Sequence, residues 1–429
     1  MIFALIMILS FFLFIAIGVP IVLALLASSL TYLLLNPSLS LLLVPIKLFR
    51  STDAFVFLSV PLFILAGKLM NVTGTTASLI NFANMLVGRL RGGLAHVNIV
   101  VSMFFGGCTG AAISDTSAVG SALIPSMEKN GYPRDFSAAV TAASSTMGPI
   151  IPPSLAFILY GAISNISIGD LFLAGIIPGV LVGVFQMLVV AYYAKKNQFP
   201  KREHRLKLGE ILSISKKASW ALMLPVIIVG GISTGFCTPT EAAAIAVFYS
   251  LFVGLVVQRN LTFSDIIVSM RESAVESGAI MVIVAAAALF GWVLAMEQIP
   301  MKLAEFFVHA TSSPWQVLVL INIGLLVLGM FMDYAPAVIL IAPILLPLYA
   351  KLGMDPLQAG VMTCVNLITG LATPPVGCCL FAASVISGES YEKVCLAILP
   401  FIFMNLLALG LITYFPFITT FIPRVVFGH

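Results

Sequence analysis

The sequence predicts an all-α polytopic membrane protein, and three observations support this fold class. Only 9% of the 429 residues are charged and 60% are hydrophobic, whereas a soluble domain carries roughly 25% charged residues. The apolar stretches repeatedly exceed the ~18 residues that mark a membrane-spanning helix. They are continuous rather than alternating, which is not the pattern of a transmembrane β-barrel.

Uninterrupted apolar segments predict the full spans. The first runs from about 3 to 34, contains no basic residue and is too long for the apolar region of a signal peptide, so we expect a true span. A basic loop, 195–217, separates the two halves of the chain. The other predicted spans lie at about 54–71, 171–194, 218–235, 239–257, 274–296 and 392–418.

Two further apolar stretches, 94–129 and 314–352, are each interrupted by a polar, helix-breaking centre. Their halves are about 13–18 residues long, which is short for a full span. Irregular backbone at membrane depth is tolerated only inside protein or beside a watery cavity. We therefore expect two re-entrant helical hairpins, each entering the membrane and leaving on the same side.

Two spans are predicted to be broken helices, because proline removes a backbone donor and glycine loosens the helix. The stretch 133–165 is interrupted at "MGPIIPPS", and the stretch 356–387 at "NLITGLATPPVG". Each half of the chain therefore holds one hairpin and one broken helix.

The two halves also match each other in sequence. A shift of 222 residues places Pro125–Pro178 on Pro347–Pro400 with nine identical pairs, mostly Gly and Pro. A shift that is four residues shorter pairs Asp115 with Asp333. We predict two repeats, residues 1–194 and 218–429, on either side of the basic loop.

The repeats are offset by five spans, an odd number, so we expect them to lie inverted in the membrane, as in many secondary transporters. The positive-inside rule places the basic loop in the cytoplasm. Span parity then places sixteen of the 21 Lys and Arg residues inside and five outside. It also places the N-terminus in the cytoplasm and the C-terminus outside, with the first hairpin entering from the cytoplasm and the second from outside.

The hairpin centre and the helix break of each repeat carry the candidate binding residues. Freed backbone carbonyls and the oxygens of Ser, Thr and Asn suit a hard cation such as sodium, whereas opened helix N-termini favour an anion. The candidate cation ligands are Thr109, Gly110, Ser144, Ser145, Gly148, Asn366, Thr369, Gly370 and Thr373. The candidate substrate-binding residues are Ser114, Asp115, Thr116, Pro152, Asp333, Pro336 and Pro374.

Asp115 and Asp333 allow two interpretations. Acids within a membrane are functional candidates by default, but either could instead cap the hairpin helix that follows. Thr238, Pro239 and Glu241 match a capping box, for which we expect a structural role.

Five long motifs extend over much of the chain. They are "VPLFILAGKLMN" (60–71), "GRLRGGLAHVNIVVSMFFGGCTGAAISDTSAVGSALIPSM" (88–127), "YPRDFSAAVTAASSTMGPIIPPS" (132–154), "LYGAISNISIGDLFLAGIIPG" (159–179) and "TPTEAAAIAV" (238–247). Together they resemble the large membrane subunit of the tripartite ATP-independent periplasmic (TRAP) transporters.

The resemblance implies a scaffold and a moving transport domain of elevator type. It implies sodium-coupled import of an organic acid, such as a sialic acid or a C4-dicarboxylate, across the bacterial inner membrane. The partners it implies are a separate small four-helix membrane subunit and a periplasmic substrate-binding protein. We expect no cofactor besides sodium as the coupling ion, no nucleic-acid partner and no enzymatic activity.

Two other functions are alternatives to this one. A stand-alone organic-anion/sodium symporter would need no binding protein, and reconstitution with and without the soluble partner separates the two. An intramembrane aspartyl protease would use Asp115 and Asp333. Such enzymes carry their acids on full spans with a Gly-x-Gly-Asp string, and the sequence has neither feature.

Overall fold

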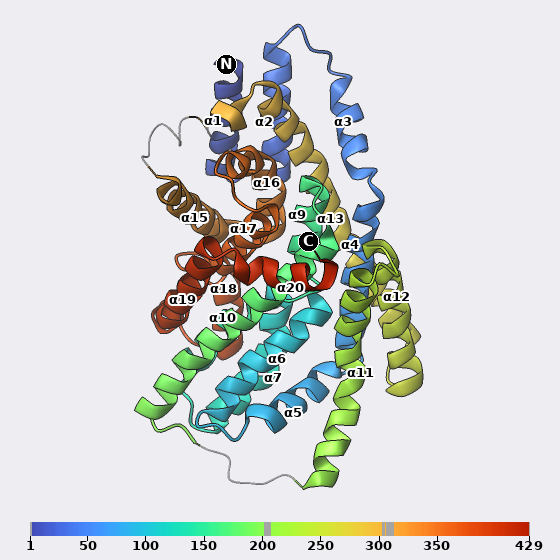
Figure 1. The fold of residues 1–429 in the computed structure, drawn as a ribbon, viewed down its shortest axis with the longest axis vertical. Coiled ribbons are helices and arrows are strands. Elements are labelled where there is room, and N and C mark those ends of the chain that lie inside the picture. The colour runs from blue at the N-terminus through green and yellow to red at the C-terminus, as the bar shows by residue number, and fades with distance from the viewer. Residues whose placement is uncertain (1, 201–206, 303–304, 306–312, 429) are drawn as a thin grey trace.

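The computed structural model describes residues 2–200, 207–302, 305 and 313–428, and for residues 107–109 it describes the backbone alone (Figure 1). The regular elements in this described part are helices, and eight of them are long and apolar enough to cross a membrane. The predicted all-α polytopic membrane fold is confirmed.

The helices before the basic loop are α1 (Ile2–Ala16), α2 (Ile21–Leu35), α3 (Leu43–Thr52), a 3-10 turn (Phe55–Leu58), α4 (Ser59–Val72), α5 (Thr75–Val87), α6 (Gly93–Thr109), α7 (Ala112–Lys129), α8 (Arg134–Ser145), α9 (Leu155–Ser164) and α10 (Ile168–Lys196). Those after it are α11 (Leu208–Ser233), α12 (Pro239–Phe252), a π-turn (Val253–Val257), α13 (Phe263–Met296), α15 (Pro314–Phe331), α16 (Tyr334–Lys351), α17 (Pro356–Gly370), α18 (Cys378–Ser387), α19 (Tyr391–Tyr414) and α20 (Phe417–Phe427).

The first apolar segment is not one span, and that prediction is wrong. The chain turns at Gly18, which has a φ of 84°, and Pro20 directly precedes α2. The short helices α1 and α2 therefore pack against each other as an antiparallel hairpin (Figure 1). Because the two helices are antiparallel, the N-terminus and the α2–α3 connection lie at the same end of this hairpin. The predicted side of the N-terminus assumed that this segment crosses the membrane once, and that assumption no longer holds.

We expect cysteine labelling to detect this hairpin. In a cysteine-free background, Ile2→Cys and Ser40→Cys should react from the same side of the membrane, since both positions are exposed at one end of the α1–α2 pair. Lys207→Cys, beside the basic loop, should react from the other side. A membrane-impermeant maleimide distinguishes the sides, and reaction of Ile2→Cys and Lys207→Cys from one side would contradict the arrangement.

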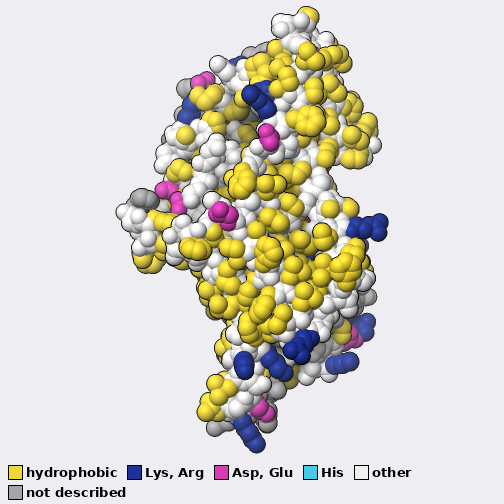
Figure 2. Space-filling view, turned by 90° about the vertical axis from the view of Figure 1, so that its right-hand side faces the viewer, with side chains coloured by type: hydrophobic (Ala, Val, Ile, Leu, Met, Phe, Trp, Pro, Cys, Tyr) yellow, Lys and Arg dark blue, Asp and Glu magenta, His cyan; other side chains and the backbone are white. Residues whose placement is uncertain are grey.

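The predicted basic loop, 195–217, is also shorter than expected. Helix α10 continues to Lys196 and α11 begins at Leu208, whereas residues 201–206 lie outside the described part. Figure 2 shows a largely hydrophobic face with Lys and Arg gathered towards its lower end, where α10 ends and α11 begins in Figure 1. Large apolar side chains on the surface, such as Phe248 at 73% exposure, suit lipid rather than water.

Each predicted hairpin and each predicted helix break falls on a pair of consecutive helices. That the hairpins are re-entrant stays a prediction, because α15 and α16 are each long and apolar enough to cross a membrane. The hairpins are α6–α7 and α15–α16, and the breaks separate α8 from α9 and α17 from α18. Helices α7 and α16 begin at Ala112 and Tyr334, 222 residues apart in the sequence. The inverted orientation of the repeats stays a prediction.

The pairing of Asp115 with Asp333 is wrong, because the two acids occupy different positions in their hairpins. Asp333 is the residue before α16, and its Oδ1 accepts a hydrogen bond from the Tyr334 N–H at 2.7 Å. Asp115 lies inside the first turn of α7, whose N-cap is Ala111. Asp333 therefore caps the N-terminus of α16, whereas Asp115 is not the cap of α7.

Each hairpin connects the two broken helices. Its first helix packs on the broken helix of the same half, α6 on α8 and α15 on α17. Its second helix also packs on the far part of the other broken helix, α7 on α18 and α16 on α9. In Figure 1 the first hairpin lies in the lower half of the molecule and the second in the upper half. Helix α13 runs along α2, α3 and α4, and α12 packs on α4.

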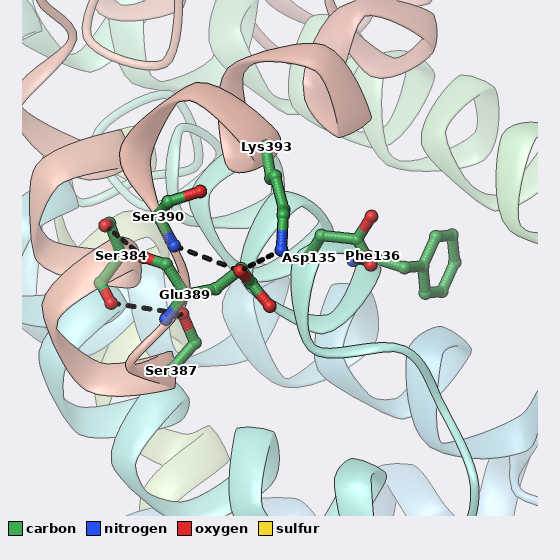
Figure 3. A network of polar contacts seen from close by, with 7 residues as sticks. All are labelled: Asp135, Phe136, Ser384, Ser387, Glu389, Ser390 and Lys393. Carbon is green, nitrogen blue, oxygen red and sulfur yellow. Dashed lines mark hydrogen bonds and ion pairs between the residues drawn. The ribbon is translucent and has the colours of Figure 1, made fainter.

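A network of polar contacts lies in the connection between α18 and α19 and extends to α8 (Figure 3). Lys393 Nζ donates to Glu389 Oε1 at 2.9 Å, and the Ser390 N–H donates to the same oxygen at 3.1 Å. The hydrogen bond from Lys393 lowers the pKa of Glu389. Asp135, in the first turn of α8, lies beside Lys393, so this network links the two halves at one end of the broken helices.

The predicted capping box at the start of α12 is confirmed. Thr238 Oγ1 accepts from the Glu241 N–H at 3.3 Å, and Glu241 Oε2 accepts from the Thr238 N–H at 2.8 Å. Pro239 occupies the first helical position, where the missing donor is not needed.

Candidate functional site

The first centre is built where the hairpin α6–α7 meets the break after α8. Gly106 on α6 lies so close to this break that an added Cβ would be 2.3 Å from the Gly148 Cα. An added Cβ on Gly148 would in turn be 2.1 Å from Asp115 Oδ2. The fully buried Asp115 carboxylate therefore points at the broken backbone. Two glycines are needed here because no side chain fits between hairpin and break.

A chain of polar side chains links α6 to α8 below this point. Asn98 donates through Nδ2 to Thr141 Oγ1 at 2.7 Å, and its Oδ1 accepts from Ser144 Oγ at 2.9 Å. Ser102 Oγ donates to Ser144 Oγ at 3.0 Å. Ser145 Oγ donates to the Thr141 carbonyl at 2.7 Å. All these groups are buried, so this polar chain lies in the protein interior beside the helix break.

The second centre repeats this construction with the hairpin α15–α16 and the break after α17. An added Cβ on Gly370 would lie 2.5 Å from the Gly329 carbonyl carbon. The break is held to the hairpin by the Gly377 N–H, which donates to the Met330 carbonyl at 3.2 Å. In both centres the second helix of the break follows a cis Pro–Pro bond, at Pro152–Pro153 and Pro374–Pro375.

Asn366 is the polar residue at the middle of the second centre. Its Nδ2 donates to the carbonyl and to Oδ1 of Asn322, at 2.9 and 2.7 Å. Its own Oδ1 is fully buried and has no hydrogen-bond donor within the described residues. Thr369 and Thr373 lie one and two turns further on, and Thr373 Oγ1 donates to the Thr369 carbonyl at 2.8 Å. A buried oxygen without a donor fits a cation ligand.

The two centres are joined by one residue that sequence reasoning missed. Tyr334, at the start of α16, donates through its hydroxyl to the Gly110 carbonyl at 3.0 Å. Gly110 lies at the turn of the other hairpin with a φ of 62°. The tip of each hairpin therefore touches the other. The signal for this contact is a tyrosine directly after Asp333 in the hairpin centre, but its partner is 224 residues away in the sequence.

A small open cleft, with a cavity volume of about 50 Å³, lies between the first hairpin tip and the helices α4 and α13. It is lined from the hairpin by Gly110, Ala111 and Ser114, and from the break and α9 by Pro153, Leu155 and Ile158. Helices α4 and α13 contribute Phe63, Ile64, Gly67, Lys68, Asn71 and Glu276. The cleft therefore has the uncharged hairpin tip on one side and a pair of charges, Lys68 and Glu276, on the other.

The structure brings some predicted substrate residues to this cleft and leaves others away from it. Ser114 lines the cleft and is exposed, whereas Asp115 and Thr116 are buried behind it. Asp333 is exposed at the second hairpin tip. Three prolines do not line the cleft: Pro152 and Pro336 are buried, and Pro374 is half-buried.

The predicted cation ligands divide between the two centres. Gly110, Ser144, Ser145 and Gly148 surround the first, and Asn366, Thr369, Gly370 and Thr373 the second. Thr109 ends α6, and its side chain lies outside the described residues. Lys68 lines the cleft but is not among the predicted site residues, because its position in a largely apolar helix does not reveal the cleft.

The fold and the two centres define a polytopic membrane protein with hairpins and discontinuous helices, the construction used by secondary transporters. A family model described as "Tripartite ATP-independent periplasmic transporter, DctM component" matches residues 8–418. The chain belongs to this family, the large permease subunits of TRAP transporters.

Similar proteins support this assignment. The sialic acid TRAP transporter large permease protein SiaM of Vibrio cholerae is 37% identical over 415 residues, 96% of each chain. The C4-dicarboxylate TRAP transporter large permease protein DctM of Pseudomonas aeruginosa is 39% identical over 399 residues, 93% of each chain. The YdaH transporter of Alcanivorax borkumensis shares the fold, with a TM-score of 0.60 over 89% of this chain and 88% of that one at 15% identity.

Proposed function

We propose that this subunit performs sodium-coupled import of an organic acid, and that sodium binds at the two centres. The observation that carries the proposal is the buried Asn366 Oδ1, which has no donor within the described residues and lies beside the break after α17. Backbone carbonyls near Gly148 and Gly370 would complete the shells. Sialic acid and C4-dicarboxylate permeases among the similar proteins support an organic acid as substrate.

Two sodium ions, one per centre, would give a sufficient driving force. Each tenfold sodium gradient supplies about 1.4 kcal/mol per ion. Two sodium ions with a monovalent acid carry one net positive charge inward, so the membrane potential adds about 2.3 kcal/mol per 100 mV. Both contributions favour uptake.

The proposal includes two partners and an elevator motion. Members of this family work with a small membrane subunit and a periplasmic binding protein, and one similar protein, the isethionate permease DctMQ of Oleidesulfovibrio alaskensis, is longer than this chain, which covers 65% of it. The hairpins and broken helices would move as one block, because Tyr334 and the crossed packing of α7 on α18 and α16 on α9 hold them together. Helices α2, α4, α12 and α13 would form the scaffold. With the basic loop in the cytoplasm, the N-terminus would face the periplasm.

Uptake into proteoliposomes tests this proposal. The subunit is reconstituted with its small partner, and labelled N-acetylneuraminate and labelled succinate are offered with the binding protein present and absent. We expect uptake of an acid only with an inward sodium gradient and the binding protein. Equal uptake without the binding protein would favour the stand-alone symporter, and uptake that ignores sodium would contradict the coupling ion.

Two hydroxyl substitutions test the proposed sodium ligands. Ser145→Ala and Thr373→Val each remove a hydroxyl. In the wild type both hydroxyls donate their hydrogen to a helix carbonyl, which leaves the oxygen lone pairs for a cation. We expect each to raise the sodium concentration for half-maximal uptake several-fold, because the site loses roughly the free energy of one ligand hydrogen bond or ion contact. The melting temperature in detergent controls for folding. Unchanged sodium activation in both variants would remove these residues from the sites.

A further inference from the structure

The cleft beside the first hairpin holds one cation and two acids that the proposed sodium sites do not use. Lys68 Nζ on α4 lies 3.2 Å from Glu272 Oε2 and 3.2 Å from Glu276 Oε2 on α13. The two glutamates are one helical turn apart and therefore share a face of α13. Lys68 thus holds two carboxylates at once, and this three-residue cluster carries a net negative charge.

The cluster faces the hairpin tip rather than lipid. Lys68 and Glu276 line the cleft opposite Ser114 and the turn at Gly110, whereas Glu272 does not line it. Among the residues that line the cleft, Lys68 is the cation. The lysine side chain is 28% exposed, so an incoming solute can reach it.

Stability alone gives a weak reason for this arrangement. Ion pairs that are this exposed contribute little to folding, because water screens the charges and two long side chains must be ordered. A scaffold surface along which another domain moves needs few fixed charges. An ammonium group has three donors, and the two glutamates occupy only two of them.

We propose that Lys68 is the counter-ion for the carboxylate of the transported acid, and that Glu276 exchanges with this carboxylate. When the acid enters the cleft, its carboxylate takes the place of Glu276 at Nζ. When Glu276 returns to Lys68, it competes with the acid and promotes release, and Glu272 stays paired throughout. This inference rests on the proposed organic-acid transport and adds the residue that makes a negative charge on the solute necessary.

Four variants test the exchange: Lys68→Gln, Lys68→Arg, Glu276→Gln and, as the matched control, Glu272→Gln. The readout is sodium-loaded exchange of labelled N-acetylneuraminate or succinate, whichever the wild type transports. The same binding protein is present in every assay, so that differences in the concentration for half-maximal exchange between variants belong to the permease. Lys68→Gln should raise the half-maximal acid concentration by roughly tenfold or more, because the acid loses one charge-assisted contact. Lys68→Arg should stay close to the wild type.

Glu276→Gln should lower the half-maximal concentration and also the maximal rate, because the competitor that promotes release is gone. Glu272→Gln keeps Glu276 as the competitor that promotes release, so it should retain the maximal rate of the wild type, even where loss of a negative charge beside Lys68 shifts the half-maximal concentration. The sodium concentration for half-maximal activation should stay constant in all four variants. An unchanged half-maximal acid concentration in Lys68→Gln, or equal effects of Glu272→Gln and Glu276→Gln, would overturn the inference and leave sodium-coupled transport intact.

The same assay separates the failure of the inference from the failure of the proposed function. If the wild type exchanges neither acid in a sodium-dependent manner, the proposed function is wrong and the role of Lys68 falls with it. If Lys68→Gln does not fold, as judged by its melting temperature, Glu276→Gln decides the question, because Lys68 keeps its pair with Glu272 in that variant.

Discussion

Gly370→Ala is expected to abolish transport. A Cβ on Gly370 would lie 2.5 Å from the Gly329 carbonyl carbon and 2.6 Å from its Cα. These are backbone atoms of the facing hairpin, so no side-chain rotation can make room. Overpacking of this kind typically costs about 1–3 kcal/mol. Because the contact holds the hairpin against the helix break, we expect a melting temperature several degrees lower, by roughly the usual shift per kcal/mol, and uptake near background.

Gly324→Ala is the matched control on the hairpin helix α15. Nothing lies within 4 Å of a Cβ at this position, which is exposed. Alanine is favoured over glycine in a helix interior by roughly 0.5–1 kcal/mol, so this variant should be as stable as the wild type or more so. The two substitutions are chemically identical and should act in opposite directions. Wild-type uptake by Gly370→Ala would show that the close approach of hairpin and break is not needed for function.

The hairpins and the helix breaks could be predicted from the sequence because Gly and Pro act locally. Proline removes an amide donor wherever it stands, and "GPIIPPS" and "GLATPPVG" therefore mark interrupted helices whatever surrounds them. The interruptions in the hairpins proved shorter than the polar centres suggested. Helix α7 already includes Ser114 and Thr116, because the turn needs only Gly110 and Ala111.

The α1–α2 hairpin was missed because hydropathy does not distinguish one long span from two short helices. The informative signal was local: Gly18 and Pro20 interrupt the apolar run, and such a pair marks a turn. The wrong pairing of Asp115 with Asp333 has another cause. Each acid lies in a hairpin centre, but Asp115 is inside a helix and Asp333 precedes one. Sequence distance alone does not distinguish these two positions.

The contacts that make the candidate site join residues from distant elements, and composition or spacing does not reveal such contacts. Tyr334 reaches Gly110 only because the second hairpin crosses to the first. Lys68 meets Glu276 only because α4 and α13 lie side by side. Of the polar ligands, the sequence could indicate Asn366 from its place before a helix break, whereas its pairing with Asn322 depends on how α15 packs on α17.

Asn366→Val is expected to weaken sodium activation by at least about tenfold, the scale of one lost ligand contact in a dry site. The substitution removes the buried Oδ1, which has no donor within the described residues, together with two hydrogen bonds to Asn322.

Two further variants separate the loss of the oxygen from the loss of these hydrogen bonds. Asn366→Asp keeps side-chain oxygen for a cation but loses the Nδ2 donor, so it should retain more sodium activation than the valine variant. Asn322→Ala removes the side-chain acceptor and leaves Asn366 Oδ1 in place, so it should lower the melting temperature more than the sodium affinity. The measurement is the sodium concentration for half-maximal uptake at saturating acid, beside the melting temperature with and without sodium. If Asn322→Ala weakens sodium activation as strongly as Asn366→Val, the amide acts through the α15–α17 contact rather than as a ligand, and the second sodium site loses its central residue.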